Sequence, residues 1–268
     1  MPAQSALITV MDRAARKAAG KLRRDFNEVQ NLQVSRKGPA DFVSNADRAA
    51  ERTLREELGK ARPGWGFLLE EAGEHAGEPG APRWIVDPLD GTTNFLHGIP
   101  HFAISIAVEE NGVVTAGLIH QPLTDESFYA ERGRGAWVQS ERLRVSARRD
   151  LADCLIATGI PFMGHGDHPE WRAIFAEVSP QVAGIRRFGS AALDLAWVAA
   201  GRYDGYWESG LSPWDVAAGI LLVREAGGFV SDYRGGDRMI DRREVVAGND
   251  AIHSKLHRLV AGAIKPGR

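Results

Sequence analysis

Two aspartates that stand three residues apart follow an apolar run in the first half of the chain. Residues 84–94 read WIVDPLDGTTN, and the apolar start of this string is typical of a buried strand. Pro88 fixes its own φ and pushes Asp87 toward an extended backbone, so we expect the chain to turn here. The turn would let Asp87 and Asp90 face one point. Two carboxylates that share a point predict a cation site.

A glycine and two threonines follow the second aspartate. Gly91 lets the backbone come close to a ligand, because it carries no Cβ. The main-chain amides and the hydroxyls of Thr92 and Thr93 are donors suited to phosphate oxygens. Asp, Pro and Gly also dominate ordinary turns, so the four-residue core is weak evidence by itself. The whole string is rarer, and it predicts cation ligands beside donors for an anion.

A third aspartate stands where a helix is expected to begin. Residues 212–219 read SPWDVAAG, and residues 224–228 read REAGG. Ser212 suits the N-cap and Pro213 the first helical position. Asp215 would be the third helical residue, where a carboxylate complements the free amides of the helix start. Capping alone explains Asp215, but the acidic string upstream makes a metal ligand the favoured interpretation.

Residues 84–94 and residues 212–228 together resemble the two signatures of the inositol monophosphatase family. This family is part of a superfamily of lithium-sensitive, magnesium-dependent phosphatases. The resemblance extends over nearly the whole chain. It implies an α+β fold, the layered αβαβα sandwich of the inositol monophosphatase and fructose-1,6-bisphosphatase type, usually as a homodimer.

Paired acids end another apolar run, because residues 67–71 read FLLEE. A glutamate that binds metal in the family matches Glu70, and Glu71 is its neighbour. Leu69 stands where the family usually has a glycine, which changes backbone freedom beside the site but not the ligand. An isolated acidic pair would more simply be a solvated strand end before an irregular loop at residues 72–82.

The N-terminal segment at residues 37–47, KGPADFVSNAD, also resembles the family. Ser44 and Asp47 have the spacing of a capping pair at the start of a helix. The resemblance instead gives Asp47 a hydrogen bond with Thr92 that helps to orient the attacking water. It also makes Lys37 a site lysine that balances the acidic cluster, although such a lysine is more often a solvated charge.

The resemblance implies two to three Mg²⁺ ions and attack by water without a phosphoenzyme. Oxygen-only ligands, with no Cys or His in any motif, also favour Mg²⁺ over zinc. The implied metal ligands are Glu70, Asp87, the carbonyl of Leu89, Asp90 and Asp215. Asp87 would bridge the first two ions, and a weaker third would lie near Glu70. The implied catalytic residues are Asp47, Glu70 and Thr92. Lithium is expected to inhibit, because it supplies too little charge.

Substrate contacts follow from the resemblance at a further set of positions. They are Gly91, Thr92, Thr93, Gly189, Ser190, Ala191, Glu208 and Asp215. A carboxylate such as Glu208 can accept hydrogen bonds from vicinal hydroxyls, which fits an inositol ring. Ser190 could equally be the N-cap of a helix over residues 191–200. Arg186 and Arg187 suit either an anionic ligand or a subunit interface.

Composition restricts the class of protein without deciding its function. The 268 residues are 44% hydrophobic and carry a formal charge of −2, so a substantial core is available and broad nucleic-acid affinity is not expected. Cys154 is the only cysteine, which excludes an internal disulfide and favours a buried thiol. With no signal-peptide pattern and no apolar run long enough to cross a bilayer, we expect a cytoplasmic protein without membrane spans.

Helices and strands must bring these distant residues together. Apolar residues repeat at helical spacing over residues 7–26, which predicts a long amphipathic helix. Residues 103–108 and 113–119 read as strands, and the Asn111-Gly112 pair between them predicts a hairpin. From residue 155 onward helices and strands alternate, and Asn249 is expected to cap the last helix.

A charged stretch at residues 142–150 predicts a boundary between two lobes. The N-terminal lobe, residues 1–145, would hold the main metal and phosphate motifs. The C-terminal lobe, residues 146–268, would hold the substrate contacts and Asp215. The stretch is too short and too charged for a free linker, so we expect one compact catalytic unit.

The predicted reaction is hydrolysis of inositol-1-phosphate to inositol and phosphate. The same superfamily acts on histidinol phosphate, fructose 1,6-bisphosphate or phosphoadenosine phosphate, and the metal motifs do not separate these. Glu208 and the turn at residues 189–191 favour an inositol-type monoester. A different class is a regulatory protein, because residues 186–215 resemble bacterial relatives that serve in transcription complexes. The intact metal motifs argue for catalysis but do not exclude such a second role.

Overall fold

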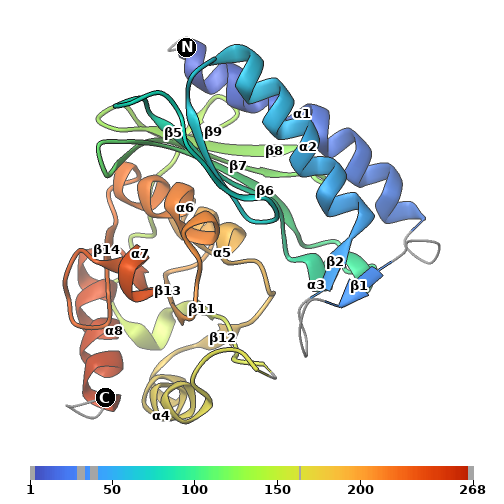
Figure 1. The fold of residues 1–268 in the computed structure, drawn as a ribbon. Helices are drawn as coiled ribbons and strands as arrows, with labels where there is room; N and C mark the ends of the chain where they lie inside the picture. Colours follow the sequence, from blue (N-terminus) through green and yellow to red (C-terminus); the bar gives the residue numbers. More distant parts are fainter. Residues whose placement is uncertain (1–3, 29–33, 37–41, 163, 265–268) are drawn as a thin grey trace.

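The computed structural model describes residues 4–28, 34–36, 42–162 and 164–264. Its elements form five layers in the order helices, sheet, helices, sheet, helices (Figure 1). These layers confirm the α+β sandwich expected from the sequence, in which helices and sheets bury apolar faces against one another. Lys37 lies outside the described residues, so its predicted role stays a prediction.

The first layer consists of two amphipathic helices, α1 (Ala6–Asn27) and α2 (Asn45–Ala61), that lie side by side over one face of the larger sheet (Figure 1). The buried face of α1 is rich in small side chains, which let α2 and the sheet come close. These are Ala14, Ala15, Ala18 and Ala19. The long helix predicted over residues 7–26 is confirmed.

The second layer is an eight-stranded sheet. Its strands are β3 (Gly66–Leu69), β4 (Gly73–His75), β5 (Arg83–Asp90), β6 (Ala103–Glu110), β7 (Val113–Gln121), β8 (Glu126–Glu131), β9 (Gly135–Val138) and β10 (Glu141–Arg142). The spatial order is β10-β9-β8-β7-β6-β5-β3-β4. Asn111 and Gly112 both have positive φ, 52° and 77°, which confirms the hairpin between β6 and β7. Two short strands, β1 (Val34–Arg36) and β2 (Phe42–Ser44), form a separate pair.

Two local expectations near the site were wrong. The loop at residues 72–82 is not wholly irregular, because it contains β4, which pairs antiparallel with β3. The chain also does not turn at Pro88, since β5 continues to Asp90. The pairing of β5 with β6 shifts register between Asp87 and Asp90, and such a bulge tolerates a proline that cannot donate to the ladder. The turn follows at Gly91, whose φ is 98°.

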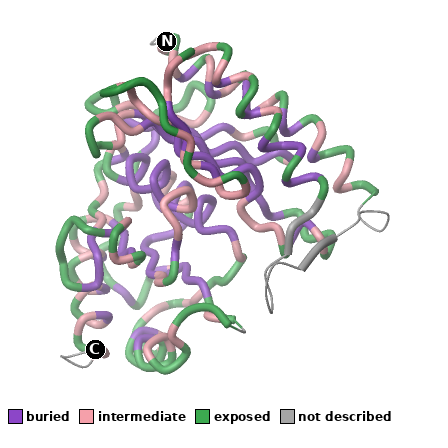
Figure 2. The backbone as a smooth tube through the Cα atoms, viewed as in Figure 1, coloured by how far each residue is buried: buried purple, intermediate pink, exposed green. Residues whose placement is uncertain are grey.

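The central layer consists of α5 (Ala191–Ala199) and α6 (Pro213–Glu225), which lie between the two sheets (Figure 1). Both helices are buried over most of their length, and Figure 2 shows them in the buried interior with the sheets. A Cβ on Gly117 of β7 would lie 2.9 Å from the Cα of Ala218 in α6. The larger sheet therefore packs closely against the middle of α6, where no side chain would fit at Gly117.

The last two layers are a five-stranded mixed sheet and the helices outside it. The strands are β11 (Leu155–Thr158), β12 (Gly184–Arg186), β13 (Gly205–Ser209), β14 (Phe229–Ser231) and β15 (Glu244–Gly248), in the order β12-β11-β13-β15-β14. Helices α4 (His168–Val178) and α8 (Asp250–Ala263) cover its outer face (Figure 1). Asn249 caps α8 by accepting from the Ile252 amide, as predicted. Cys154 is buried, also as predicted.

The remaining elements are short. They are α3 (Thr92–Leu96), α7 (Met239–Arg242) and 3-10 turns at Leu151–Asp153 and Ser179–Gln181. The chain passes from the larger to the smaller sheet between β10 and β11, close to the boundary expected at residues 142–150. The central helices share one apolar core with both sheets. The two sheets therefore do not have separate cores. The division into lobes 1–145 and 146–268 stays a prediction.

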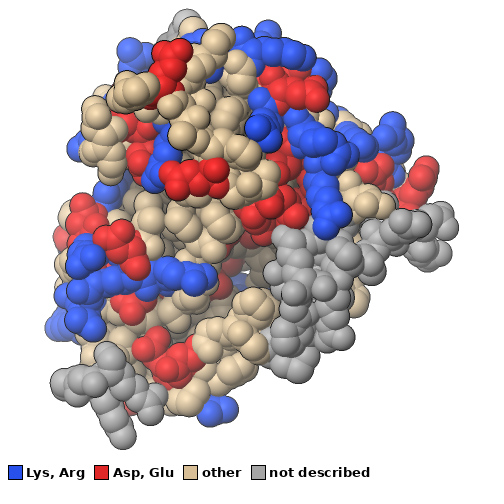
Figure 3. Space-filling view, in the orientation of Figure 1, with Lys and Arg blue, Asp and Glu red and all other residues tan. Residues whose placement is uncertain are grey.

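The visible face of the molecule carries acidic and basic side chains side by side (Figure 3). This mixture agrees with a formal charge of −2. Among the helices that the structure describes, none is both long enough and apolar enough to span a bilayer.

Candidate active site

A cavity of about 540 Å³ opens where the C-terminal end of β5 meets the N-terminal ends of α5 and α6. Most of the predicted site residues line it. These are Glu70, Asp90, Gly91, Thr92, Thr93, Gly189, Ser190, Ala191, Glu208 and Asp215. Asp87 and Leu89 are buried in β5 directly before the lining residues. Segments that are far apart in the sequence therefore meet at one opening.

The β5 bulge holds the first aspartate in place. The Leu89 amide donates to Oδ1 of Asp87 over 2.8 Å, so the carboxylate folds back over the bulge around Pro88. The hydroxyl of Thr92 donates to the Leu89 carbonyl over 2.9 Å. The resemblance implied that Thr92 would bond to Asp47, but its single proton points at Leu89 here. The Thr92–Asp47 pair therefore stays a prediction.

The second aspartate sits at the start of α5. Oδ2 of Asp90 accepts from the Ser190 hydroxyl over 2.6 Å and from the Ala192 amide over 2.8 Å. The same Ser190 oxygen accepts from the Leu193 amide, so Ser190 is the N-cap of α5. Capping and substrate contact were equal alternatives in the sequence; the structure confirms the cap, and the substrate contact of Ser190 stays a prediction. The free amides of a helix start favour the negative charge of Asp90.

The third aspartate follows the same plan at the start of α6. Oδ2 of Asp215 accepts from the Ser212 amide over 2.7 Å, as expected for a third helical residue after an N-cap serine. For Asp87, Asp90 and Asp215, the hydrogen bonds found within the described residues end on one carboxylate oxygen each. Donors from the local backbone, with the Ser190 hydroxyl in the case of Asp90, thus fix each of the three carboxylates at the end of β5 or at a helix start.

These carboxylates impose a large electrostatic cost on one another. Burial raises the pKa of Asp87 and Asp215 well above the usual aspartate value, and the neighbouring carboxylates raise both further. Burial also raises the pKa of Asp90 to about 6, against the hydrogen bonds that it accepts. Buried like charges stay ionised only beside positive charge. Oxygen ligands of this kind suit a hard divalent cation such as Mg²⁺, so the residues present fit the metal that the resemblance implied.

A second acidic group adjoins the aspartates. Carboxylate oxygens of Asp47, Glu70 and Glu71 lie within 4.8 Å of one another, close enough to share a cation. The Glu70 amide donates to the carbonyl of Val86, which places Glu70 beside β5. Glu71 also faces Arg48, whose Nε lies 4.0 Å from its carboxylate. Sequence reasoning gave Asp47 only a role in orienting water, whereas this geometry also places it among candidate ligands.

Asn94 is a cavity residue that sequence reasoning missed. Its Nδ2 donates to the carbonyls of His101 over 2.8 Å and Phe188 over 2.7 Å. It thereby ties the α3 turn to the segment that carries Gly189. Asn94 directly follows the predicted motif, but its partners gave no local signal, because one of them lies 94 residues away.

Another part of the cavity lining also went unpredicted. It consists of Phe162, His165, Trp171 and Arg243. Phe162 and His165 stack with ring centroids 4.5 Å apart, and Phe162 is 44% exposed. The cavity is therefore lined by acidic side chains and by aromatic rings. Its volume of about 540 Å³ has room for an organic group attached to a phosphate.

Known proteins resemble the chain over most of its length. The model of the inositol monophosphatase family matches residues 3–265. The chain is 58% identical to the "Inositol-1-monophosphatase" of Mesorhizobium japonicum, over 96% of this chain and 97% of that protein. It is 45% identical to the "Nus factor SuhB" of Salmonella typhimurium, over 92% of each chain.

A solved structure shows the same fold. The crystal structure of the extragenic suppressor protein suhB from Bartonella henselae has a TM-score of 0.94 and 57% sequence identity. The match covers 97% of this chain and 100% of that chain. The αβαβα layers are therefore shared along the whole length of a relative.

Proposed function

We propose, because this chain belongs to the inositol monophosphatase family, that it hydrolyses inositol-1-phosphate to inositol and phosphate with the help of Mg²⁺. The family makes the chain a phosphatase that depends on a divalent metal. The choice of inositol-1-phosphate is the finer step. The observation that carries it is the single cavity in which Asp90, Thr92 and Glu208 meet, with acids for metal, donors for phosphate and a carboxylate for hydroxyls.

The metal would be held by the buried acids around β5. We assign this role to Glu70, Asp87, the Leu89 carbonyl, Asp90 and Asp215, with two to three ions as the proposed number. When bound, Mg²⁺ supplies positive charge to the phosphate dianion and to the leaving oxygen. The high pKa values of the aspartates support this role, because a nearby cation restores their ionised form.

The chain's own donors and acceptors would position the reactants. The main-chain amides of Thr92 and Thr93 and the Thr93 hydroxyl would donate to the phosphate oxygens, because the Thr92 hydroxyl already donates its proton to Leu89. Thr92 and Asp47 would orient a water molecule opposite the ester oxygen. Attack by this water would form one P–O bond and break the P–O bond to the alcohol, and a proton from the water would pass to the leaving oxygen, so that inositol and phosphate are released. Glu70 would act on the same water, because its carboxylate lies within 4.8 Å of that of Asp47.

The leaving alcohol would face the C-terminal half. Glu208 lines the cavity and can accept from ring hydroxyls. Ser190 already donates its proton to Asp90, so its contribution to the substrate would be as an acceptor or through the main chain of Gly189 and Ala191.

Phosphate release from a panel of monoesters tests the proposal. The purified protein should hydrolyse inositol-1-phosphate best, need Mg²⁺ and lose activity in lithium. Histidinol phosphate, fructose 1,6-bisphosphate and phosphoadenosine phosphate are the controls for the rest of the superfamily. A preference for one of these would retain the mechanism and replace the substrate.

A second candidate role is binding to transcription-complex proteins, because relatives at 45% identity are named Nus factors. Glu70→Ala should abolish turnover yet retain such binding. Pull-down of purified transcription elongation factors by wild type and by the variant tests this. Failure of both to bind would remove the candidate.

We also propose a homodimer in the cytoplasm, and sedimentation equilibrium at two concentrations tests the oligomeric state.

A further inference from the structure

A buried tyrosine holds the carboxylate of Glu208. Both residues belong to β13, two positions apart, so their side chains leave the same face of the strand. The Tyr206 hydroxyl donates to Oε2 of Glu208 over 2.7 Å. Tyr206 is fully buried, so packing around its ring fixes the position of its hydroxyl. The carboxylate, in turn, lines the cavity.

A glycine holds the same carboxylate from the neighbouring strand. β11 runs parallel to β13 with Thr158 opposite Trp207, which brings Gly159 next to Glu208. A Cβ on Gly159 would lie 1.9 Å from Oε1 of Glu208, so no other residue fits here without moving the carboxylate. The absence of a side chain also lets the Gly159 amide reach the carboxylate as a donor.

The surroundings of Glu208 disfavour its ionised form, and the two donors oppose this effect. Burial raises the pKa of Glu208 to about 7, and the charge of Asp90 raises it as well. The hydrogen bond from Tyr206 acts in the opposite direction, as do the positive charge of Arg187 and the hydrogen bond from Gly159. Asp194 is a further buried acid that Glu208 affects electrostatically. Neighbouring acids therefore repel the Glu208 carboxylate, and donors are needed to keep it aimed at the cavity.

We propose that Tyr206 and Gly159 are positioning residues that set substrate specificity by fixing the acceptor oxygens of Glu208 toward the hydroxyls of the leaving alcohol. This inference rests on the proposed function, because it assigns Glu208 to the alcohol. A carboxylate has about four acceptor sites, so two bonds to the protein leave others for a substrate. A fixed carboxylate discriminates between a polyol monoester and one whose leaving group has no hydroxyls nearby, since unpaired buried acceptors penalise the wrong substrate.

The test compares kcat/KM for inositol-1-phosphate with kcat/KM for p-nitrophenyl phosphate, whose leaving group offers no neighbouring hydroxyl. The ratio of the two should fall about tenfold in Tyr206→Phe, because a hydrogen bond to a charged group is lost. Tyr203→Phe is the matched control, since Tyr203 is also buried and its hydroxyl has no partner among the described residues. It should leave the ratio unchanged.

A double-mutant cycle shows whether Tyr206 acts through Glu208. In a Glu208→Gln background, Tyr206→Phe should have little further effect on the ratio. Equal falls in both backgrounds, or no fall in the wild-type background, would overturn the inference. Gly159→Ala should lower the ratio like Tyr206→Phe, because the atoms it meets are the far end of a flexible side chain and can move.

Crystal structures of Tyr206→Phe and of wild type separate this inference from the proposed substrate. A wild type that does not prefer inositol-1-phosphate contradicts the proposed substrate alone. The Glu208 carboxylate should shift from its wild-type position in the Tyr206→Phe crystal, whichever ester is preferred. A carboxylate that stays in place would overturn the positioning role.

Discussion

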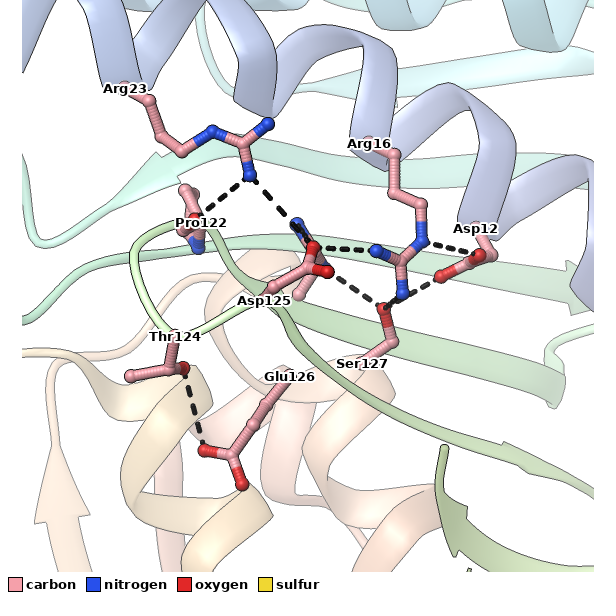
Figure 4. Close-up of polar contacts among 9 residues, drawn as sticks. Asp12, Arg16, Arg23, Pro122, Thr124, Asp125, Glu126 and Ser127 are labelled. Carbon is pink, nitrogen blue, oxygen red and sulfur yellow. Dashed lines mark hydrogen bonds and ion pairs between the residues drawn. The ribbon is translucent and has the colours of Figure 1, made fainter. Parts of the chain in front are cut away.

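Two clusters of charged side chains in this molecule have opposite designs. The first joins α1 to the turn between β7 and β8 (Figure 4). Arg16 donates to Asp12 over 2.8 Å and to Asp125 over 2.5 Å, and Arg23 lies 3.8 Å from Asp125. Ser127 donates to Asp12 over 2.6 Å. Every charge in this cluster faces a charge of the opposite sign.

The second cluster lies at the cavity and has charges of one sign. Asp87 is buried and Asp90 and Asp215 are half-buried around it, with Glu70 close by, and removal from water raises the pKa values of the three aspartates. We call the first cluster the balanced cluster. Its Ser127 also bonds to His120, whose imidazole remains uncharged because burial lowers its pKa to about 4.

The two clusters differ in how they affect the stability of the fold. Ion pairs near the surface have small and self-contained effects, because solvent screens them. Buried charges of like sign destabilise the fold until a cation joins them. A fold retains such a cluster when a bound ion restores the balance, which supports the proposal that the acidic cluster is the metal site.

Neutralising one acid should have the largest effect. Asp87→Asn removes charge with little change in size, and we expect turnover to fall at least about a hundredfold, because metal assistance contributes several kcal/mol to catalysis. The metal-free fold should keep or gain stability, since one like charge is gone. Phosphate release and urea unfolding in EDTA measure the two effects. Near-normal turnover would contradict the assignment of Asp87.

Mg²⁺ should stabilise the protein through the acidic cluster alone. At a hundred times the Kd, a bound ion adds about 2.7 kcal/mol. This corresponds to a rise in Tm of roughly 5 to 10 °C for a chain of this size. Thermal unfolding in EDTA and in Mg²⁺ measures the shift. Asp87→Asn should lose most of it, and Arg16→Ala should retain it. An unchanged wild-type Tm would argue against a metal site in the cavity.

The pH dependence of metal-free stability should depend on Asp90. Its folded pKa of about 6 exceeds the usual aspartate value of 3.8, so the folded state holds the proton more firmly. The resulting stability is present below about pH 4 and is lost as the pH rises through about 6, by about 3 kcal/mol. Urea unfolding in EDTA at several pH values measures this loss.

Asp90→Asn is the control for the pH series, and it should lack this part of the slope. Mg²⁺ should also remove the slope, because the cation keeps the carboxylate ionised at all of these pH values. The contribution of Glu126 to stability should instead decrease as the pH falls, since the hydrogen bond from Arg202 lowers its pKa. A wild type and an Asp90→Asn variant with the same slope would refute the prediction.

Breaking the balanced cluster should have the smallest effect. Arg16→Ala should destabilise the fold by about 1 kcal/mol, because the guanidinium is partly exposed and its ion pairs are screened. Turnover should stay normal. Urea unfolding and phosphate release measure both. A loss of turnover comparable to that of Asp87→Asn would erase the distinction between the two clusters.

Much of the site could be predicted because its signals are local. The N-cap at Ser212, the hairpin at Asn111-Gly112 and the helix over residues 7–26 each depend on neighbours within a few positions. The acidic strings gave the ligand types in the same way. The turn expected at Pro88 failed because pairing with β6 extended β5 through a bulge, and neighbours in the sequence do not encode that pairing.

Residue types and their spacing indicated acidic cation ligands beside phosphate donors, and the family resemblance of these motifs implied the layered fold class and the full set of ligands. Only the tertiary structure decided that Ser190 bonds to Asp90, that Asn94 joins two distant turns and that Tyr206 and Gly159 grip Glu208. The reason is physical. Backbone preferences act over a few residues, whereas contacts between distant side chains depend on how sheets and helices pack in three dimensions.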